Sequence, residues 1–191
     1  MSMFKTLKPR PKAADGSSTC LLLDISGSMD ETVTTNEEGI APRRIEVLFK
    51  AVRDTPECSG LKAFAFATHC NPLEVIPNEE GALNYIPSGG TNLAGAFATV
   101  KAAGFYNAIL ITDGQPDNEL SALNAALGMR LGIIYIGDPP TPSFLERLAA
   151  STEGTFQLAD LRSVQQLEDA IMKALPPPEA TTTDPKGPIS L

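Results

Sequence analysis

Residues 20–29, CLLLDISGSM, decide the fold of this chain. Cys20–Ile25 is a short apolar run broken only by Asp24 near its end, as is typical of a strand buried in the centre of a parallel sheet. A loop rich in Ser, Gly and Thr follows, and it begins with Ser26 and Ser28. The stretch therefore predicts a central strand that delivers oxygen-bearing side chains to one edge of a sheet.

Outward from this strand, short apolar runs alternate with amphipathic segments. Ile45, Leu48, Phe49 and Val52 fall at i, i+3, i+4 and i+7, which places them on one face of a helix. Strand–helix alternation of this kind predicts a doubly wound α/β domain, with a mostly parallel sheet and helices on both faces. The further predicted strands are Leu61–Thr68, Leu73–Ile76, Ala108–Thr112, Leu131–Ile136 and Thr155–Leu158.

Two later helices have predicted starting residues. Asp117 is suited to cap one of them. Ser163 and Gln166 have the spacing of a capping box, which predicts the start of the last helix. The helix after Asp117 is expected to turn three leucines inward, namely Leu120, Leu123 and Leu127.

The length of 191 residues predicts a single domain, which we place at residues 18–175. Residues 1–17 contain Lys, Pro and Ser without periodicity and are expected to form a flexible basic arm. Residues 176–191 begin with three prolines and are expected to form a disordered Pro-rich tail.

Composition and charge narrow the classes of function. The net charge is −8, and four of the 15 basic side chains lie within the first twelve residues. The rest of the chain therefore has 11 basic against 23 acidic side chains. An excess of acidic side chains repels the phosphate backbone of nucleic acids, so no nucleic-acid partner is expected.

The expected location is the cytoplasm. No apolar run approaches the ~18 residues of a membrane-spanning helix, and no signal peptide is recognisable, so no membrane partner is expected. The three cysteines, Cys20, Cys58 and Cys70, fit neither a disulfide framework nor a zinc site.

Three segments bring oxygen-bearing side chains to the carboxyl ends of predicted strands or the start of a helix. They are Asp24–Met29, Ser88–Asn92 and Ile111–Gly114. Ligands of doubly wound sheets bind at this edge. Carboxylates and hydroxyls without thiolate or imidazole favour Mg²⁺, Mn²⁺ or Ca²⁺ over zinc or copper. Two aspartates just neutralise a divalent ion, which leaves room for an anionic group from outside.

These motifs, Asp24-x-Ser26-x-Ser28, then Thr91 after paired glycines, then Thr-Asp113-Gly, resemble the metal-ion-dependent adhesion site of the von Willebrand factor A family. The resemblance covers about residues 18–175 and is to the DISGSM type of bacterial and intracellular members. It implies a six-stranded sheet of order 3-2-1-4-5-6, with Leu73–Ile76 as a short antiparallel edge strand. It also implies that Ser26, Ser28 and Thr91 contact the metal, with Asp24 and Asp113 binding directly or through water.

The function implied by the resemblance is a metal-dependent protein–protein interaction module. A Glu or Asp of a partner would complete the coordination of the metal. Intracellular relatives commonly act as adaptors beside AAA+ ATPases of the MoxR kind or in larger assemblies, and such an ATPase is the partner implied here. No catalytic residue and no organic cofactor are expected.

Other readings remain open. An aspartate that ends the first strand also occurs in Mg²⁺-dependent phosphohydrolases of the haloacid dehalogenase type, with Asp24 as the nucleophile. Those enzymes typically carry a second Asp where this chain has Ser26. A third reading is a structural module that never uses its ion in binding. His69 is interpreted as structural or solvated. The acidic loop with Asp30, Glu31, Glu37 and Glu38 is either solvated or flanks the cation.

Overall fold

A computed structural model describes residues 18–33 and 41–175 of the chain. The predicted arm at 1–17, the predicted tail at 176–191 and the two acids Glu37 and Glu38 lie outside the described residues. Within the described ranges, no helix is long and apolar enough to cross a membrane.

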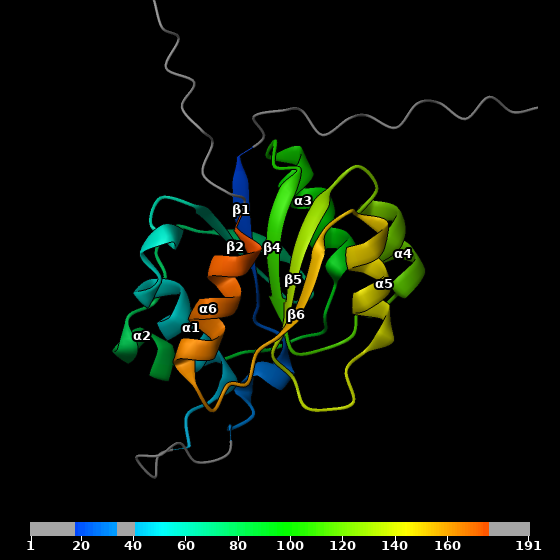
Figure 1. The fold of residues 1–191 in the computed structure, drawn as a ribbon. Coiled ribbons are helices and arrows are strands. Elements are labelled where there is room, and N and C mark those ends of the chain that lie inside the picture. Colours follow the sequence, from blue (N-terminus) through cyan, green and yellow to red (C-terminus); the bar gives the residue numbers. More distant parts are fainter. Residues whose placement is uncertain (1–17, 34–40, 176–191) are drawn as a thin grey trace, which may run out of the picture.

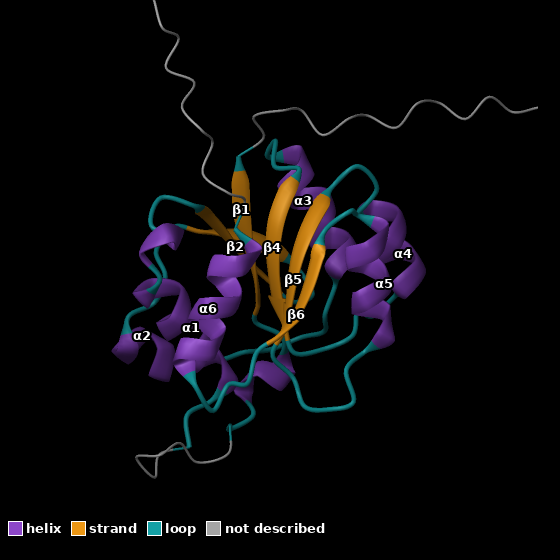
Figure 2. Ribbon diagram, in the orientation of Figure 1, coloured by secondary structure: helices purple, strands orange, loops and turns teal. Residues whose placement is uncertain are grey.

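The described residues form a six-stranded sheet with the order β3-β2-β1-β4-β5-β6 (Figures 1 and 2). All neighbouring strands are parallel except β2 and β3. The predicted strand order and the single antiparallel edge strand are therefore confirmed. The strands are β1 (Thr19–Asp24), β2 (Lys62–Phe66), β3 (Cys70–Leu73), β4 (Asn107–Thr112), β5 (Arg130–Tyr135) and β6 (Thr155–Leu158).

Helices cover both faces of the sheet. Two of them, α1 (Arg44–Asp54) and α6 (Val164–Ala174), lie on one face together with the short α2 (Glu79–Leu83). The opposite face is covered by α3 (Leu93–Ala102), α4 (Glu119–Ala125) and α5 (Ser143–Ser151) (Figure 1). Two single-turn 3-10 helices, η1 (Gly27–Asp30) and η2 (Pro56–Cys58), follow β1 and α1.

Two apolar cores lie on the two faces of the sheet, and β1 contributes to both. Its alternate residues point to opposite faces, so Leu21 and Leu23 pack with α1 and α6, whereas Leu22 packs with the helices of the other face. Burial of both faces explains why β1 is a continuous apolar run. The same burial places Asp24 at the end of a central strand, where it is fully buried.

The antiparallel edge strand begins earlier than expected. The predicted range Leu73–Ile76 shares only Leu73 with β3, which spans Cys70–Leu73. The tight reversal after β2 brings Cys70 opposite Phe66, so pairing starts at once and ends before the apolar Val75 and Ile76. Pro72 lies within β3, opposite Phe64.

The helix α4 differs from its prediction in two respects. Its cap is Asn118, whose side chain accepts a hydrogen bond from the Ser121 backbone N–H, and not Asp117. Leu120 and Leu127 are 69% and 56% exposed, so the prediction that they point inward is wrong. Ala122 and Ala126 are buried, and of the three predicted leucines only Leu123 packs, half-buried, against the core.

The last helix, α6, begins after Ser163 as predicted, but the capping box does not form. The Ser163 side chain makes no capping hydrogen bond, and the Gln166 N–H donates to the Ser163 backbone carbonyl instead.

The start of α1 is tied to the loop that follows β1. The Arg44 N–H donates to the Glu31 carbonyl over 2.9 Å, and Val33 N–H donates to the Pro42 carbonyl over 2.8 Å. The Arg43 guanidinium pairs with Asp30 and donates to three backbone carbonyls at the end of α2. These contacts fix the first turn of α1 beside the carboxyl edge of the sheet.

Candidate metal centre

The candidate site lies at the carboxyl ends of the adjacent central strands β1 and β4. Leu23 is paired with Ile111, so the two strands end level with each other. Asp24 and Asp113 are therefore brought to one point, although they are 89 positions apart in the sequence. Both are buried, with exposed fractions of 0% and 6%. Two buried carboxylates at one point need a source of compensating positive charge.

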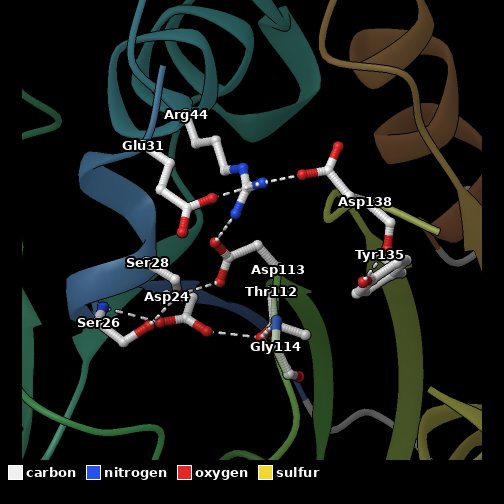
Figure 3. A network of polar contacts seen from close by, with 10 residues as sticks. All are labelled: Asp24, Ser26, Ser28, Glu31, Arg44, Thr112, Asp113, Gly114, Tyr135 and Asp138. Atoms are coloured by element: carbon white, nitrogen blue, oxygen red, sulfur yellow. Dashed lines mark hydrogen bonds and ion pairs between the residues drawn. The ribbon is translucent and has the colours of Figure 1, made fainter. Parts of the chain in front are cut away.

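Both oxygens of the Asp24 carboxylate accept hydrogen bonds from uncharged donors. The Ser26 backbone N–H donates to Oδ1 over 2.8 Å, and the Thr112 hydroxyl donates to Oδ2 over 2.5 Å (Figure 3). Burial raises the pKa of Asp24 to about 6, against the lowering effect of these hydrogen bonds. Among the described residues no basic side chain forms an ion pair with Asp24. The surroundings of this carboxylate therefore suit an added cation.

A chain of hydroxyls connects the first loop to the second aspartate. The oxygens of Ser26 and Ser28 lie 3.2 Å apart, and the Ser28 hydroxyl donates to Oδ1 of Asp113 over 2.8 Å (Figure 3). The 3-10 turn η1 produces this arrangement, because it folds Ser28 back over the end of β1. Four of the five predicted ligands, Asp24, Ser26, Ser28 and Asp113, thus belong to one polar cluster.

The fifth predicted ligand, Thr91, lies near Gly114, and its backbone is hydrogen-bonded to Asp117. Its N–H donates to Oδ1 of Asp117 over 3.0 Å, and its carbonyl accepts from the Asp117 N–H over 3.1 Å. Its hydroxyl lies 3.8 Å from the position that a β-carbon on Gly114 would occupy. Thr91 is 7% exposed, so its side chain is enclosed where the second and third segments meet.

Backbone hydrogen bonds also join the first and second segments. Gly27 N–H donates to the Gly89 carbonyl and Ser88 N–H donates to the Ile25 carbonyl, each over 3.1 Å. Gly89 has a φ of +86°, a conformation that favours glycine, and the nearby Thr68 hydroxyl leaves no room for a side chain there. The first and second predicted segments are therefore joined by main-chain contacts.

The donor set fits a hard divalent cation. It consists of two carboxylates and three hydroxyls, all oxygen, which is the chemistry that Mg²⁺, Mn²⁺ and Ca²⁺ prefer. No group of three or more His, Cys, Asp or Glu that could hold a metal occurs among residues 18–33 and 41–175. A metal at this point would thus depend on the hydroxyls of Ser26, Ser28 and Thr91 as well as on the two aspartates.

Several residues of the cluster were not predicted as part of the site. Arg44 donates to Oδ2 of Asp113 over 2.8 Å, and its guanidinium also pairs with Glu31 and Asp138 (Figure 3). Thr112 belongs to the third motif, but only its contact with Asp24 shows that it supports the site. Arg44 carried no usable signal, because it begins a helix whose pattern is explained by its apolar face.

Comparisons with known proteins support the fold. No protein-family model matches the sequence, and no curated protein matches it. Among solved structures, the chain is similar to the ArnB paralog VWA2 from Sulfolobus acidocaldarius, with 18% identity and a TM-score of 0.56 over 82% of this chain and 44% of that one. It is also similar to a von Willebrand factor type A structure from Catenulispora acidiphila, with 15% identity and a TM-score of 0.56 over 83% of this chain and 42% of that one. The chain therefore has the fold of von Willebrand factor A domains and spans less than half of the length of these structures.

Proposed function

We propose that this chain is a metal-dependent protein–protein interaction module. Asp24, Ser26, Ser28, Thr91 and Asp113 hold one Mg²⁺, or Mn²⁺ or Ca²⁺ in its place. When bound, the cation supplies a positive centre to which a Glu or Asp of a partner protein attaches. The module works in the cytoplasm as an adaptor, and an AAA+ ATPase of the MoxR kind is the partner that the family resemblance implies.

One observation carries this proposal. Two buried carboxylates lie at the same edge of the sheet within a cluster of hydroxyls, and one of them, Asp24, is held only by uncharged donors. A divalent ion would supply the positive charge that Asp24 lacks, whereas Asp113 already pairs with Arg44. It would also keep an open position, because five side chains fill fewer than the roughly six or more positions around such an ion. The proposal assigns no catalytic step to Asp24, in contrast to the haloacid dehalogenase alternative.

The first test is thermal unfolding of the purified chain during titration with MgCl₂ or MnCl₂. A ligand that binds only the folded state at about 100 times its Kd adds about 2.7 kcal/mol of stability. For a domain of this size we expect Tm to rise by about 5–10 °C. Asp24→Asn and Asp113→Asn should each abolish most of this rise. Asp169→Asn, an exposed aspartate on α6, is the matched control and should keep it.

Three outcomes would contradict the proposal. If the Tm of the wild-type chain does not change at about 10 mM metal, the chain does not have the proposed metal site. A partner captured equally well in Mg²⁺ and in EDTA would remove the metal from the interaction. Turnover of a phosphate ester that disappears in Asp24→Asn would support the phosphohydrolase reading instead.

A further inference from the structure

Arg44 is a buried cation at the edge of the candidate metal centre. Its side chain is 9% exposed, and its Nη1 lies 2.8 Å from Oδ2 of Asp113, whose side chain is fully buried. Nη2 pairs with Glu31 over 2.9 Å and with Asp138 over 2.5 Å (Figure 3). The contacts of α1 with η1 and of Arg43 with α2 fix the backbone that carries this guanidinium.

The charges of these partners are not equivalent. The side chains of Glu31 and Asp138 are 62% and 84% exposed, so water and salt screen them strongly. Asp24, Asp113 and Arg44 are enclosed, and their charges act on one another at short range. The enclosed groups therefore carry two negative charges and one positive charge, which leaves one net negative charge before any ion binds.

The charge of Arg44 has opposite consequences for the binding of the cation and for the binding of the partner's carboxylate. A divalent cation meets repulsion from Arg44 and shares Asp113 with it, so the cation binds less tightly than it would to the aspartates alone. Once the cation is present, the enclosed groups carry one net positive charge. An incoming carboxylate is then attracted by the metal and by Arg44 together. Arg44 also lines a cleft of about 470 Å³ together with Tyr135 and Asp138.

We propose that Arg44 determines how binding energy is divided between the cation and the partner, an inference that rests on the proposed metal-dependent function. Arg44 weakens binding of the cation alone and strengthens binding of the partner's carboxylate to the metal-loaded site. The cation-bound form without a partner is therefore less populated than it would be without Arg44, and binding of the partner's acid increases the affinity for the cation.

The proposed role of Arg44 differs in its measurable effect from a role that only supports the structure. Loss of a purely structural contact to Asp113 would loosen the site and weaken the binding of both the cation and the partner's carboxylate. Loss of the charge with the site intact would instead move the two affinities in opposite directions. The Ser28 hydroxyl still holds Oδ1 of Asp113 in the absence of Arg44, so the aspartate keeps one anchor.

The experiment measures Mn²⁺ binding by electron paramagnetic resonance, with and without acetate at constant ionic strength. Acetate serves as the simplest carboxylate probe. In Arg44→Gln we expect the Kd of Mn²⁺ without acetate to fall by about tenfold or more, since a full charge a few ångströms away has been removed. We also expect acetate to enhance Mn²⁺ binding less than it does in the wild-type chain. Arg44→Lys keeps the charge and should resemble the wild type in both measurements.

The outcomes distinguish this inference from the function on which it rests. If the wild-type chain binds no Mn²⁺, the proposed function fails and this inference fails with it. If the wild type binds Mn²⁺ and Arg44→Gln binds it equally or more weakly, only the role of Arg44 is overturned. An unchanged acetate effect overturns it as well. Circular dichroism without metal checks that Arg44→Gln is folded. If Arg44→Gln is unfolded, Arg44→Met, which keeps the apolar stem, is measured in its place.

Discussion

At the scale of single residues, the environment of Asp24 is set by Thr112 on the neighbouring strand. The two side chains meet because β1 and β4 are adjacent and parallel, and the threonine hydroxyl donates to the carboxylate over 2.5 Å. Both residues are fully buried. A hydrogen bond to a buried carboxylate contributes more than one between uncharged groups, and its loss leaves an expensive polar atom behind.

Thr112→Val tests this contact, because valine keeps the shape of the side chain and removes the hydroxyl. The same hydroxyl also accepts a longer hydrogen bond from the Gly114 N–H, over 3.3 Å. We expect the free energy of unfolding in EDTA to fall by about 1–3 kcal/mol. Urea denaturation measures the change. Thr155→Val on the edge strand β6 is the matched control, since its side chain is exposed, and it should stay within about 0.5 kcal/mol of the wild type. Equal losses in the two variants would show that the contact with Asp24 contributes nothing.

The residue scale also shows what the sequence could predict about the site. Asp24, Ser26, Ser28, Thr91 and Asp113 stand in short motifs at predicted element ends, so their convergence at one edge follows from the topology. Arg44 and Asp138 reach the same point from a helix start and from the loop after β5. The ion pairs of Arg44 with Asp113 and Asp138 depend on where side chains from different elements point, and a local sequence pattern does not predict this. Whether a metal binds there remains a prediction.

At the scale of elements, periodicity predicted where strands and helices lie better than which residues they bury. Fully buried strands such as β1 and β4 were predicted well, because two covered faces demand an unbroken apolar run. The helix α4 was predicted less well, since Leu123 packs against the core as predicted but Leu120 and Leu127 are exposed. Which face of α4 is buried depends on its neighbours α3 and α5, and these cannot be read from the sequence of α4 alone.

A matched pair of leucines tests this assignment of faces. Leu120 on α4 is 69% exposed, whereas Leu145 on α5 is fully buried on the same side of the sheet. We expect Leu145→Ala to lower the free energy of unfolding by about 2–5 kcal/mol through lost contacts and a cavity. Leu120→Ala should change it by no more than about 0.5 kcal/mol. Urea denaturation compares the two variants. A large loss of unfolding free energy in Leu120→Ala would show that Leu120 belongs to the core.

At the scale of the whole molecule, one sheet separates two apolar cores that share no residue among those described. Alternate residues of β1 serve the two cores, so neither core is complete without the same strand. The candidate metal centre lies where the central strands end, and its three segments therefore depend on both cores for their positions. We infer that the described domain unfolds as one cooperative unit.

Two leucines placed on opposite faces test this cooperativity. Leu48 on α1 belongs to one core and Leu148 on α5 to the other, and both are fully buried. We expect Leu48→Ala and Leu148→Ala each to shift a single transition by about 2–5 kcal/mol, with the m-value unchanged. Circular dichroism and tyrosine fluorescence should report the same midpoint in both variants. Separate midpoints for the two signals would mean that the faces unfold independently.

Pro72 in the edge strand β3 has a consequence for the behaviour of many copies at high concentration. A sheet edge is a template on which further strands can add, and this is one route to fibrous aggregates. Proline has no N–H and is tolerated in strands where its nitrogen faces away from the neighbouring strand. With only four residues in β3, the missing donor leaves a short and interrupted template. On the β3 side, growth of the sheet from one molecule into the next is therefore discouraged.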